Sequence, residues 1–422
     1  MPRTHSETHP WISFELDLRQ APHQLWLLLG EARSKCDHLA GVPLKPSVAK
    51  KLNEVYLAKG VHATAAIEGN TLKETDVLAK MDGTLRVGKS KEYLAKEIEN
   101  ILSAANAVVS RLETQDAGPV TPQEICEYNR LILSGLALED HVVPGEYRKI
   151  SVGVANYRAP AAEFCENLMQ RMCDWLNNAD FRESKDPIVF GLLRAILAHI
   201  YLAWIHPFGD GNGRTARLVE VHMLLEAGVP MPAAHLLSNH YNQTRSEYYR
   251  KLAEASKKQS PIDFITYAVQ GFVDQIRDQL AIVREQQWRV AWQNFVHETF
   301  GSTRTPADNR CVRVLLDLSS VEQSIERSKL KELTPALALL YADKTDKTLS
   351  RDLNRLSEMG LVEINGKRVR ARREEILAFL PRGKKGAREA HLARVMPGIA
   401  KVEGQLDLFS LLDEANKLGS EE

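Results

Sequence analysis

Residues 206–217 read HPFGDGNGRTAR and connect two segments, 187–205 and 215–227, whose composition predicts helices. Three alternating glycines let the backbone turn with its N–H groups facing inward, and the loop leads into a helix N-terminus, which is a ready anion site. Arg214 and Arg217 are three residues apart, so both guanidinium groups can lean toward the same anion. The stretch therefore predicts a polyphosphate site between two helices.

Two more side chains of this loop suit a phosphate ligand. Asp210 can hold a Mg²⁺ ion, because this ion usually binds through one or two carboxylates plus substrate oxygens. His206, at the mouth of the loop, is placed to take a proton from an incoming hydroxyl. A plain glycine-rich connection between helices is the alternative. The convergence of a histidine, a carboxylate, an amide and two arginines within twelve residues favours a site instead.

The loop resembles the core motif of the Fic family, HxFx(D/E)GNGRxxR. Every defined position is matched, by His206, Phe208, Asp210, Gly211, Asn212, Gly213, Arg214 and Arg217. Fic proteins are mostly adenylyltransferases that move AMP from ATP to a Ser, Thr or Tyr hydroxyl of a protein. The resemblance therefore implies ATP as substrate, Mg²⁺ as cofactor, and a target protein that includes this chain itself. Removal of AMP, transfer of another nucleotide, and ATP sensing by a DNA-binding regulator stay open.

The resemblance also implies a role for each residue of the loop. His206 would be the general base, Asp210 the Mg²⁺ ligand and Arg217 the partner of the γ-phosphate, whereas Phe208 would anchor the loop in the core. The other nucleotide-binding positions would be Gly211, Asn212, Gly213, Arg214 and Thr215.

Residues 64–69, TAAIEG, match the inhibitory motif (S/T)xxxE(G/N) that some Fic proteins carry on a helix before the core. By resemblance, Glu68 would pair with Arg217 and occupy the space that the γ-phosphate needs. Thr64 precedes Glu68 by one helical turn, so the two would share a face and hold each other in place. A simple helix C-terminus is the alternative, since Gly69 and Asn70 form a normal stop signal. The same carboxylate could instead align a water for removal of AMP.

Two further segments are expected beside the loop. Residues 145–155 contain the run ISVGV, in which β-branched side chains alternate with Ser and Gly. This pattern predicts a short strand or hairpin. By resemblance this is the flap that pins the target by strand addition, formed by Ser151, Val152, Gly153, Val154 and Ala155. One tyrosine of the pair Tyr248 and Tyr249 would lie against the adenine, and the other would pack in the core. We expect His199 to be a core histidine.

The composition is that of an ordinary globular protein. The 422 residues suggest about three domains, and 55 basic against 55 acidic residues give no net charge. Five cysteines without zinc spacing and a start without a secretory signal predict a cytoplasmic protein. Residues 188–205 are apolar, but Arg194 and His199 interrupt them, so we expect a core helix and no membrane. Residues 83–90 satisfy the P-loop pattern without a preceding strand, and we expect a turn between helices.

We expect a mainly α fold, with a Fic-type helical core, a short β-hairpin flap and a C-terminal winged-helix domain. The best linker is GSTRTPADNR at 301–310. The expected regions are an N-terminal helical region with the inhibitory motif (1–114), the Fic core (115–260), a helical extension (261–300), a winged-helix-like domain (311–380), and a basic segment with a tail (381–422).

The C-terminal part suggests further partners. Residues 346–360 would be the recognition helix of the winged helix, and INGKRVRARR (364–373) its basic wing. Nine Lys and Arg against two Glu between Ile364 and Arg388 favour DNA, whereas a solvated face or a homodimer module is the alternative. The tail sequence QLDLF, Gln405 to Phe409, resembles the peptide by which bacterial replication proteins dock on the DNA sliding clamp. An amphipathic helix packing on its own protein is the alternative there.

Overall fold

The computed structural model describes residues 5–377, apart from 115–118, 155–156, 179–180, 182–184 and 322. The chain divides into two compact units, and the boundary between Asp278 and Gln279 falls inside one long helix. This helix, α13 (Ile262–Phe300), is the helical extension expected for 261–300. The tail motif Gln405 to Phe409 and the basic segment 381–422 lie outside the described residues.

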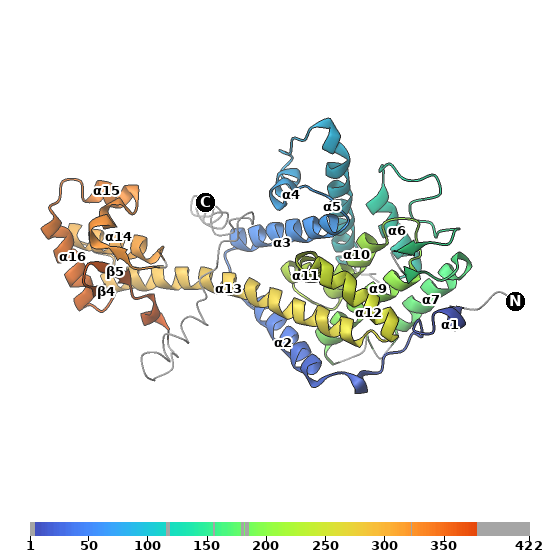
Figure 1. The fold of residues 1–422 in the computed structure, drawn as a ribbon. Coiled ribbons are helices and arrows are strands. Elements are labelled where there is room, and N and C mark those ends of the chain that lie inside the picture. Colours follow the sequence, from blue (N-terminus) through green and yellow to red (C-terminus); the bar gives the residue numbers. More distant parts are fainter. Residues whose placement is uncertain are drawn as a thin grey trace. The chain divides into compact units, whose positions relative to one another are not determined.

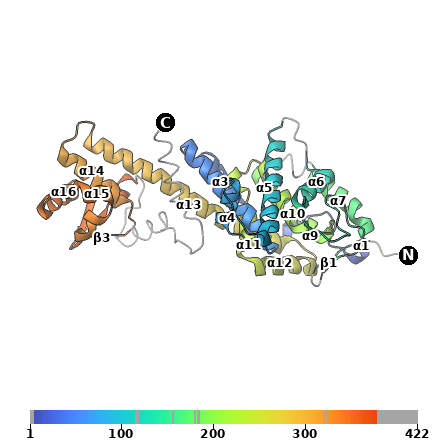
Figure 2. The same cartoon turned by 90° about the horizontal axis from the view of Figure 1, so that it is seen from above.

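Unit 1, which ends at Asp278, is helical apart from one small hairpin (Figure 1). Its elements before α13 are α1 (His5–Thr8), α2 (His23–Ala40), α3 (Pro46–Ile67), α4 (Glu74–Met81), α5 (Glu92–Leu112), α6 (Pro122–Leu133), β1 (Gly153–Val154), β2 (Tyr157–Arg158), α7 (Cys165–Leu176), α9 (Pro187–Ile205), α10 (Asn212–Glu226), α11 (Leu236–Gln243) and α12 (Arg245–Lys258). In Figures 1 and 2, α9 and α10 lie in the interior of the unit, with α3 and α5 on one side and α6 and α7 on the other. The motif loop joins these two central helices.

Helix α9 is the expected core helix. Among the described residues it is the helix long and apolar enough to cross a membrane, yet 83% of that apolar window is buried inside the protein. Its two polar side chains have buried partners, because Arg194 donates to Glu226 Oε2 at 3.0 Å and His199 Nδ1 lies 3.0 Å from Glu220 Oε2. A buried charge without a partner would be costly. These pairings explain how the core accommodates both residues.

Helix α3 carries the predicted inhibitory motif at its C-terminal end. The helix stops at Ile67, Glu68 is its C-cap, and Gly69 has a φ of +101° that favours glycine. The stop signal and the inhibitory motif therefore coincide in one turn. Apolar residues of α3, α4 and α5 form one core cluster, which includes Val61, Val77 and Ile98. The P-loop-like residues 83–90 follow α4 as a turn that leads into a short 3₁₀ helix, as expected.

The expected strand in residues 145–155 is much shorter than the alternation suggested. Only Gly153 and Val154 form β1, which pairs antiparallel with Tyr157 and Arg158 of β2. Residues 145–150 instead run along the motif loop, where Tyr147 makes an isolated bridge to Phe208. The segment contains a turn and bends and bridges to a neighbouring backbone at Tyr147, so it does not become a strand. Ala155, the last predicted flap residue, lies outside the described part of the chain.

Unit 2 begins at Gln279 and contains the C-terminal part of α13, then α14 (Pro306–Ser319), β3 (Ile325–Glu326), α15 (Pro335–Leu340), α16 (Asp346–Glu358), β4 (Val362–Asn365) and β5 (Arg368–Ala371). The strands form an antiparallel sheet in the order β3-β5-β4. This succession of elements agrees with the winged-helix prediction, which stays an interpretation. The linker prediction was too long, because Thr305 and Asp308 form a capping box that starts α14 at Pro306.

A substitution at the packed contact of α9 and α10 tests the fold. Gly191 of α9 lies so close to Ala227, at the end of α10, that an added Cβ would overlap its side chain. We expect Gly191→Ala to lower the free energy of unfolding by about 1–3 kcal/mol in urea denaturation, since overpacking displaces both helices. The control is Gly30→Ala on α2, where no atom lies within 4 Å of an added Cβ. That change should raise stability by about 0.5–1 kcal/mol. Equal effects of the two substitutions would contradict the packing argument.

Candidate active site

The motif loop is closed on itself by Asn212. The backbone N–H of Phe208 donates to Asn212 Oδ1 at 3.0 Å, and Asn212 Nδ2 donates to the carbonyl of Phe208 at 2.9 Å. Both polar groups of this side chain are therefore used within the loop. An amide nitrogen carries two N–H groups, so these bonds leave the phosphate contact of Asn212 as a prediction. His206 and Gly211 have φ values of +48° and +77° at the two bends.

Neighbouring elements fix the loop from outside. Asn129 of α6 donates to the carbonyl of Asp210 at 3.0 Å and to the hydroxyl of Thr215 at 3.2 Å. Thr215 is fully buried and takes part in holding the loop, while its predicted nucleotide contact stays a prediction. Buried Arg148 donates from Nε to the carbonyl of His206 at 2.7 Å. Sequence reasoning missed Asn129, because an asparagine inside an amphipathic helix carries no signal of its own.

His206 is held as a neutral base. Burial lowers its pKa to about 4, and the positive charge of Arg148 acts in the same direction, against the opposing effects of Glu68 and Asp210. An imidazole with this pKa is unprotonated at neutral pH and can accept a proton. The predicted role of His206 as general base is thus compatible with its surroundings.

Arg217 and Glu68 form the predicted ion pair. Arg217 is 1% exposed, and its Nη2 donates to Glu68 Oε1 at 2.5 Å and to the backbone carbonyl of Thr64 at 3.1 Å. Burial by itself would raise the pKa of Glu68, but the charge and hydrogen bond of Arg217 outweigh it and hold the pKa below its usual range. Thr64 therefore contributes its carbonyl to Arg217, where the sequence suggested a contact with Glu68. An added Cβ at Gly213 would overlap the Glu68 carboxylate, so the pair requires glycine there.

Arg214 is held by two carboxylates. Its Nη1 donates to Glu97 Oε1 of α5 at 2.5 Å, and its Nη2 donates to Asp210 Oδ1 at 3.0 Å. Sequence reasoning missed Glu97, which lies 117 positions before Arg214 in a helix that carries several other acids. Asp210 has a half-exposed side chain at the rim of the loop. A single carboxylate fits an ion such as Mg²⁺ whose other ligands come from substrate oxygens and water. Among the described residues no group of three His, Cys, Asp or Glu could hold a metal alone.

Comparison with known proteins identifies this arrangement. Residues 119–224 match the sequence model of the Fic/DOC family, a range that contains α6, the hairpin, α9 and the motif loop. The chain contains a Fic domain.

The curated relatives of this chain are named as adenylyltransferases. Protein adenylyltransferase Fic of Nematostella vectensis is 32% identical over 233 residues, which cover 54% of this chain and 50% of that protein. Protein adenylyltransferase fic-1 of Caenorhabditis elegans is 30% identical over 212 residues, which cover 50% of this chain and 38% of that protein. The matches therefore span half or less of the length of these relatives.

Solved structures show the same fold. A Fic family protein from Desulfovibrio desulfuricans G20 superimposes with a TM-score of 0.50 at 20% identity, covering 82% of this chain and 95% of that one. Fic-1 (residues 134–508) from C. elegans also gives a TM-score of 0.50, at 23% identity over 61% of this chain and 72% of that one. At these identities the likeness concerns the fold.

The predicted tyrosine pair, Tyr248 and Tyr249, divides between core and surface. Tyr248 is 3% exposed, its hydroxyl lies 2.9 Å from His199 Nε2, and its ring stacks on Tyr241. Tyr249 is 45% exposed, and its hydroxyl donates to the carbonyl of Ile67 at 3.3 Å, one residue before Glu68. Tyr249 is thus the member of the pair that a ligand can reach. His199, fully buried, is the expected core histidine.

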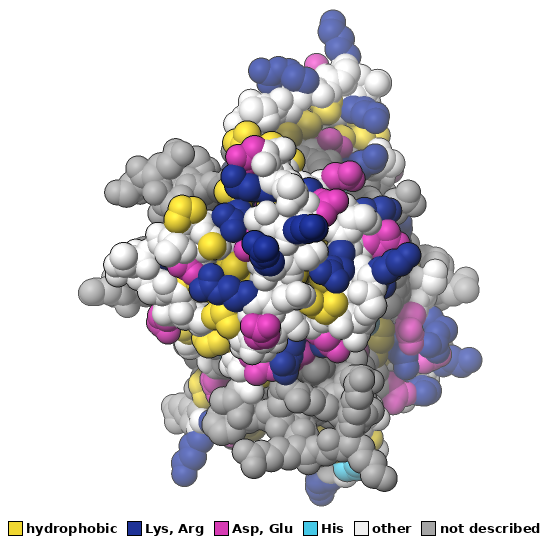
Figure 3. Space-filling view, turned by 90° about the vertical axis from the view of Figure 1, so that its left-hand side faces the viewer, with side chains coloured by type: hydrophobic (Ala, Val, Ile, Leu, Met, Phe, Trp, Pro, Cys, Tyr) yellow, Lys and Arg dark blue, Asp and Glu magenta, His cyan; other side chains and the backbone are white. Residues whose placement is uncertain are grey.

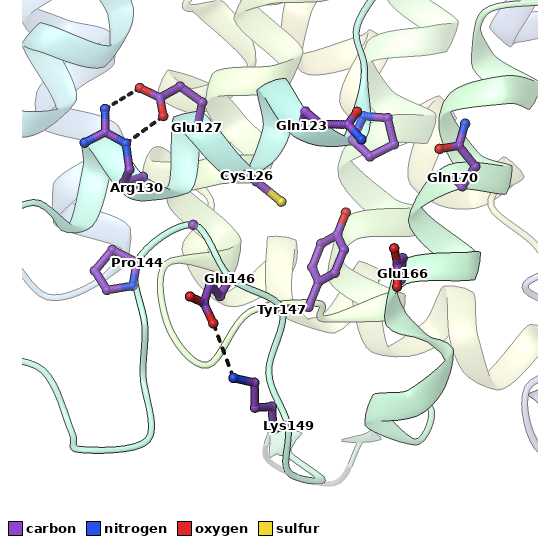
Figure 4. A pocket seen from close by; sticks show the side chains of 12 residues that line it. Gln123, Cys126, Glu127, Arg130, Pro144, Glu146, Tyr147, Lys149, Glu166 and Gln170 are labelled. Atoms are coloured by element: carbon purple, nitrogen blue, oxygen red, sulfur yellow. Dashed lines mark hydrogen bonds and ion pairs between the residues drawn. The ribbon is translucent and has the colours of Figure 1, made fainter.

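An open pocket of about 600 Å³ lies beside the loop, between α6, α7 and residues 144–149 (Figure 4). Tyr147 points into it, and the ring of Tyr147 packs against Phe208 of the motif with centroids 5.8 Å apart. The pocket also contains the thiol of Cys126, whose pKa is raised by burial. This thiol therefore stays protonated at neutral pH and is no nucleophile. The pocket adjoins the predicted flap and is separate from the arginine pairs.

Replacing Glu68 should expose the unpaired charge of Arg217. We expect Glu68→Ala to lower the free energy of unfolding by about 2–3 kcal/mol, because a buried guanidinium is left with a single carbonyl partner. Added pyrophosphate should restore stability in this variant more than in the unmodified protein, as a thermal shift measurement would show.

The matched control is Glu99→Ala, whose carboxylate pairs with Lys80 and Lys96 at the surface of α5. It should change stability by less than about 1 kcal/mol and leave the pyrophosphate effect unaltered. An equal response to pyrophosphate in the Glu68 variant and the unmodified protein would contradict the assignment of an anion site at Arg217.

Proposed function

We propose that this chain is a protein adenylyltransferase, which transfers AMP from ATP to a Ser, Thr or Tyr hydroxyl of a protein, including its own. The observation that carries the proposal is the placement of neutral His206 in the same loop as the N-terminus of α10 and the two buried arginines. A base for a hydroxyl thus lies beside groups that bind phosphates. The names of the curated relatives give the same reaction.

In the proposed reaction His206 accepts the proton of the target hydroxyl while that oxygen attacks the α-phosphorus of ATP. The bond from this phosphorus to the bridging oxygen of the β-phosphate breaks, and pyrophosphate leaves. Arg214, Arg217 and the amides at the start of α10 bind the phosphates and stabilise the charge of the transition state. Asp210 would hold Mg²⁺, which supplies neutralisation of phosphate charge when bound. The exposed ring of Tyr249 would lie against adenine.

Glu68 would restrain this reaction. Its carboxylate occupies a hydrogen-bonding position of Arg217 that the γ-phosphate needs, and its negative charge repels that phosphate. A coupling of about 1–3 kcal/mol between restraint and productive binding corresponds to roughly 5- to 150-fold suppression. Displacement of the turn at residues 68–70 would remove this restraint. The same carboxylate leaves removal of AMP as the alternative activity of this site.

Further partners are proposed on weaker grounds. DNA binding by unit 2 rests on its basic wing, yet three of the described arginines there are paired with carboxylates: Arg370 with Glu363 and Glu374, Arg372 with Glu375, and Arg373 with Glu285. On the face of unit 2 drawn in Figure 3, basic side chains are interspersed with acidic ones. These pairings reduce the charge available to a phosphate backbone. A homodimer, clamp docking through the tail and a cytoplasmic location also remain proposals.

Transfer of label from α-labelled ATP with Mg²⁺ tests the proposed function. We expect weak incorporation into the unmodified protein, an increase of roughly 5- to 150-fold in Glu68→Gly, and none in His206→Ala. Intact mass should show added AMP, and UTP, GTP and CTP serve as competing substrates. ATP binding without any label in the Glu68 variant would overturn adenylyl transfer and favour AMP removal or sensing.

The pH dependence of transfer should reflect the lowered pKa of His206. Because this pKa is about 4, the base stays unprotonated as the pH falls from 8 to 5.5. Single-turnover rates of Glu68→Gly at saturating ATP and Mg²⁺ should therefore change less than about twofold over this range, whereas a base with the ordinary pKa near 6.5 would lose about tenfold. A rate that falls with an apparent pKa near 6.5 would contradict the role of a buried neutral His206.

A further inference from the structure

A side-chain network reaches the motif loop from α5. Glu97 has a side chain that is 12% exposed and uses both carboxylate oxygens: Oε1 accepts from Arg214 Nη1 at 2.5 Å, and Oε2 accepts from Asn70 Nδ2 at 2.8 Å. Asn70 is itself buried and also donates to the carbonyl of Leu94 at 3.1 Å. Its Oδ1 accepts from the backbone N–H of Leu72 at 3.0 Å. Hydrogen bonds to both of its carboxylate oxygens therefore hold Glu97 in place.

Asn70 belongs to the turn that carries Glu68. The two carboxylates that meet the two motif arginines, Glu68 with Arg217 and Glu97 with Arg214, thus lie on one hydrogen-bonded scaffold of α3, its C-terminal turn and α5. Glu68 accepts a hydrogen bond from Arg217 Nη2, a donor that a bound phosphate would need. The geometry of Arg214 is different, and it indicates another role for Glu97.

Arg214 can keep Glu97 and still bind a phosphate. A guanidinium has five N–H donors, of which Glu97 uses one on Nη1 and Asp210 one on Nη2. Among the described residues the Nε of Arg214 has no hydrogen-bond partner. Three donors are therefore left for phosphate oxygens while the bond to Glu97 persists. The side chain of Arg214 is buried, with 9% of its surface exposed, and its printed partners are Glu97 and Asp210.

We propose that Glu97, fixed by Asn70, is the positioning residue that aims Arg214 at the phosphates of the bound nucleotide. The inference rests on the proposed function, because it takes a nucleotide phosphate as the ligand of Arg214. Glu97 touches no substrate in this account. It acts through the guanidinium, whose remaining donors it directs toward the loop at the start of α10.

If Glu97 positions Arg214, neutralising Glu97 should have the opposite effect on ATP binding from the effect that net charge alone predicts. Glu68, Glu97 and Asp210 set against Arg214 and Arg217 leave the site with an excess of one negative charge. Removal of a negative charge from such a site should strengthen ATP binding if only the overall field mattered. If Glu97 positions Arg214, its neutralisation weakens ATP binding instead, because the charge-assisted bond that orients the guanidinium is lost.

The experiment measures binding of ATP with Mg²⁺, and of adenosine, by titration calorimetry in the Glu68→Gly background. Adding Glu97→Gln should weaken ATP binding about tenfold, the effect of one charge-assisted hydrogen bond, and leave adenosine binding within about twofold. Asn70→Ala should weaken ATP binding in the same direction, because it leaves Glu97 with one partner. In a background that also carries Arg214→Ala, Glu97→Gln should no longer weaken ATP binding.

Glu99→Gln is the matched control on α5, since Glu99 pairs with Lys80 and Lys96 at the surface and lies two positions from Glu97. The Glu99→Gln substitution should change neither the affinity for ATP nor the affinity for adenosine. ATP binding by the Glu97 variant that is equal to or tighter than that of its parent overturns the inference, as does the same weakening when Arg214 is absent. A parent that binds ATP without transferring AMP overturns the proposed function alone, whereas a parent that binds no ATP overturns both.

Discussion

The ion pair between buried Arg217 and partly exposed Glu68 is the interaction on which the arrangement of the site depends. Arg217 is 1% exposed in the second turn of α10, where water cannot solvate its charge. A buried guanidinium needs a carboxylate or an anionic ligand, so the end of α3 must meet the start of α10. Several backbone features follow from this requirement. α3 ends at Ile67, a glycine at 69 turns the chain, and a glycine at 213 leaves room for the carboxylate. The position of Glu68 thus joins the end of α3 to the arginine of the motif loop.

Hydrogen bonds within the protein hold the motif loop in place without a bound substrate. Asn212 closes it, Asn129 holds it from α6, and Arg148 holds the carbonyl of His206. These bonds fix the imidazole and the amides at the start of α10 before any ligand arrives, which is what phosphoryl chemistry requires. Since Tyr147 packs on Phe208 beside the hairpin, the segment that precedes the flap is part of the same assembly. The segment that leads to the hairpin and the motif loop are therefore joined by direct contact.

Much of the fold and of the site could be predicted from particular residues. The Thr121-Pro-Gln-Glu start of α6 formed the capping box that its sequence indicates, and the apolar segment 188–205 became the core helix. The pairing of Glu68 with Arg217 could be predicted because the long core motif contains Arg217 and made the short motif around Glu68 meaningful. Predictions failed where a contact needed one residue from each of two distant helices. Glu97 and Asn129 are such residues, and no local pattern distinguishes them from other polar residues of α5 and α6. The hairpin predicted at 145–155 is present but short, because pairing requires a partner strand and alternation does not supply one.

The sequence by itself determined the composition of the motif loop, the helical character of the chain and the carboxylate that pairs with Arg217, because each could be read from residues that are neighbours along the chain. Only the tertiary structure decided which tyrosine reaches a ligand, that Asn212 and Thr215 shape the loop, and that the arginines of the wing are paired with glutamates. It also decided that Glu97 holds Arg214 across 117 positions. The physical reason is that burial, hydrogen-bond partners and pKa values are properties of a packed environment, which side chains from several elements create together.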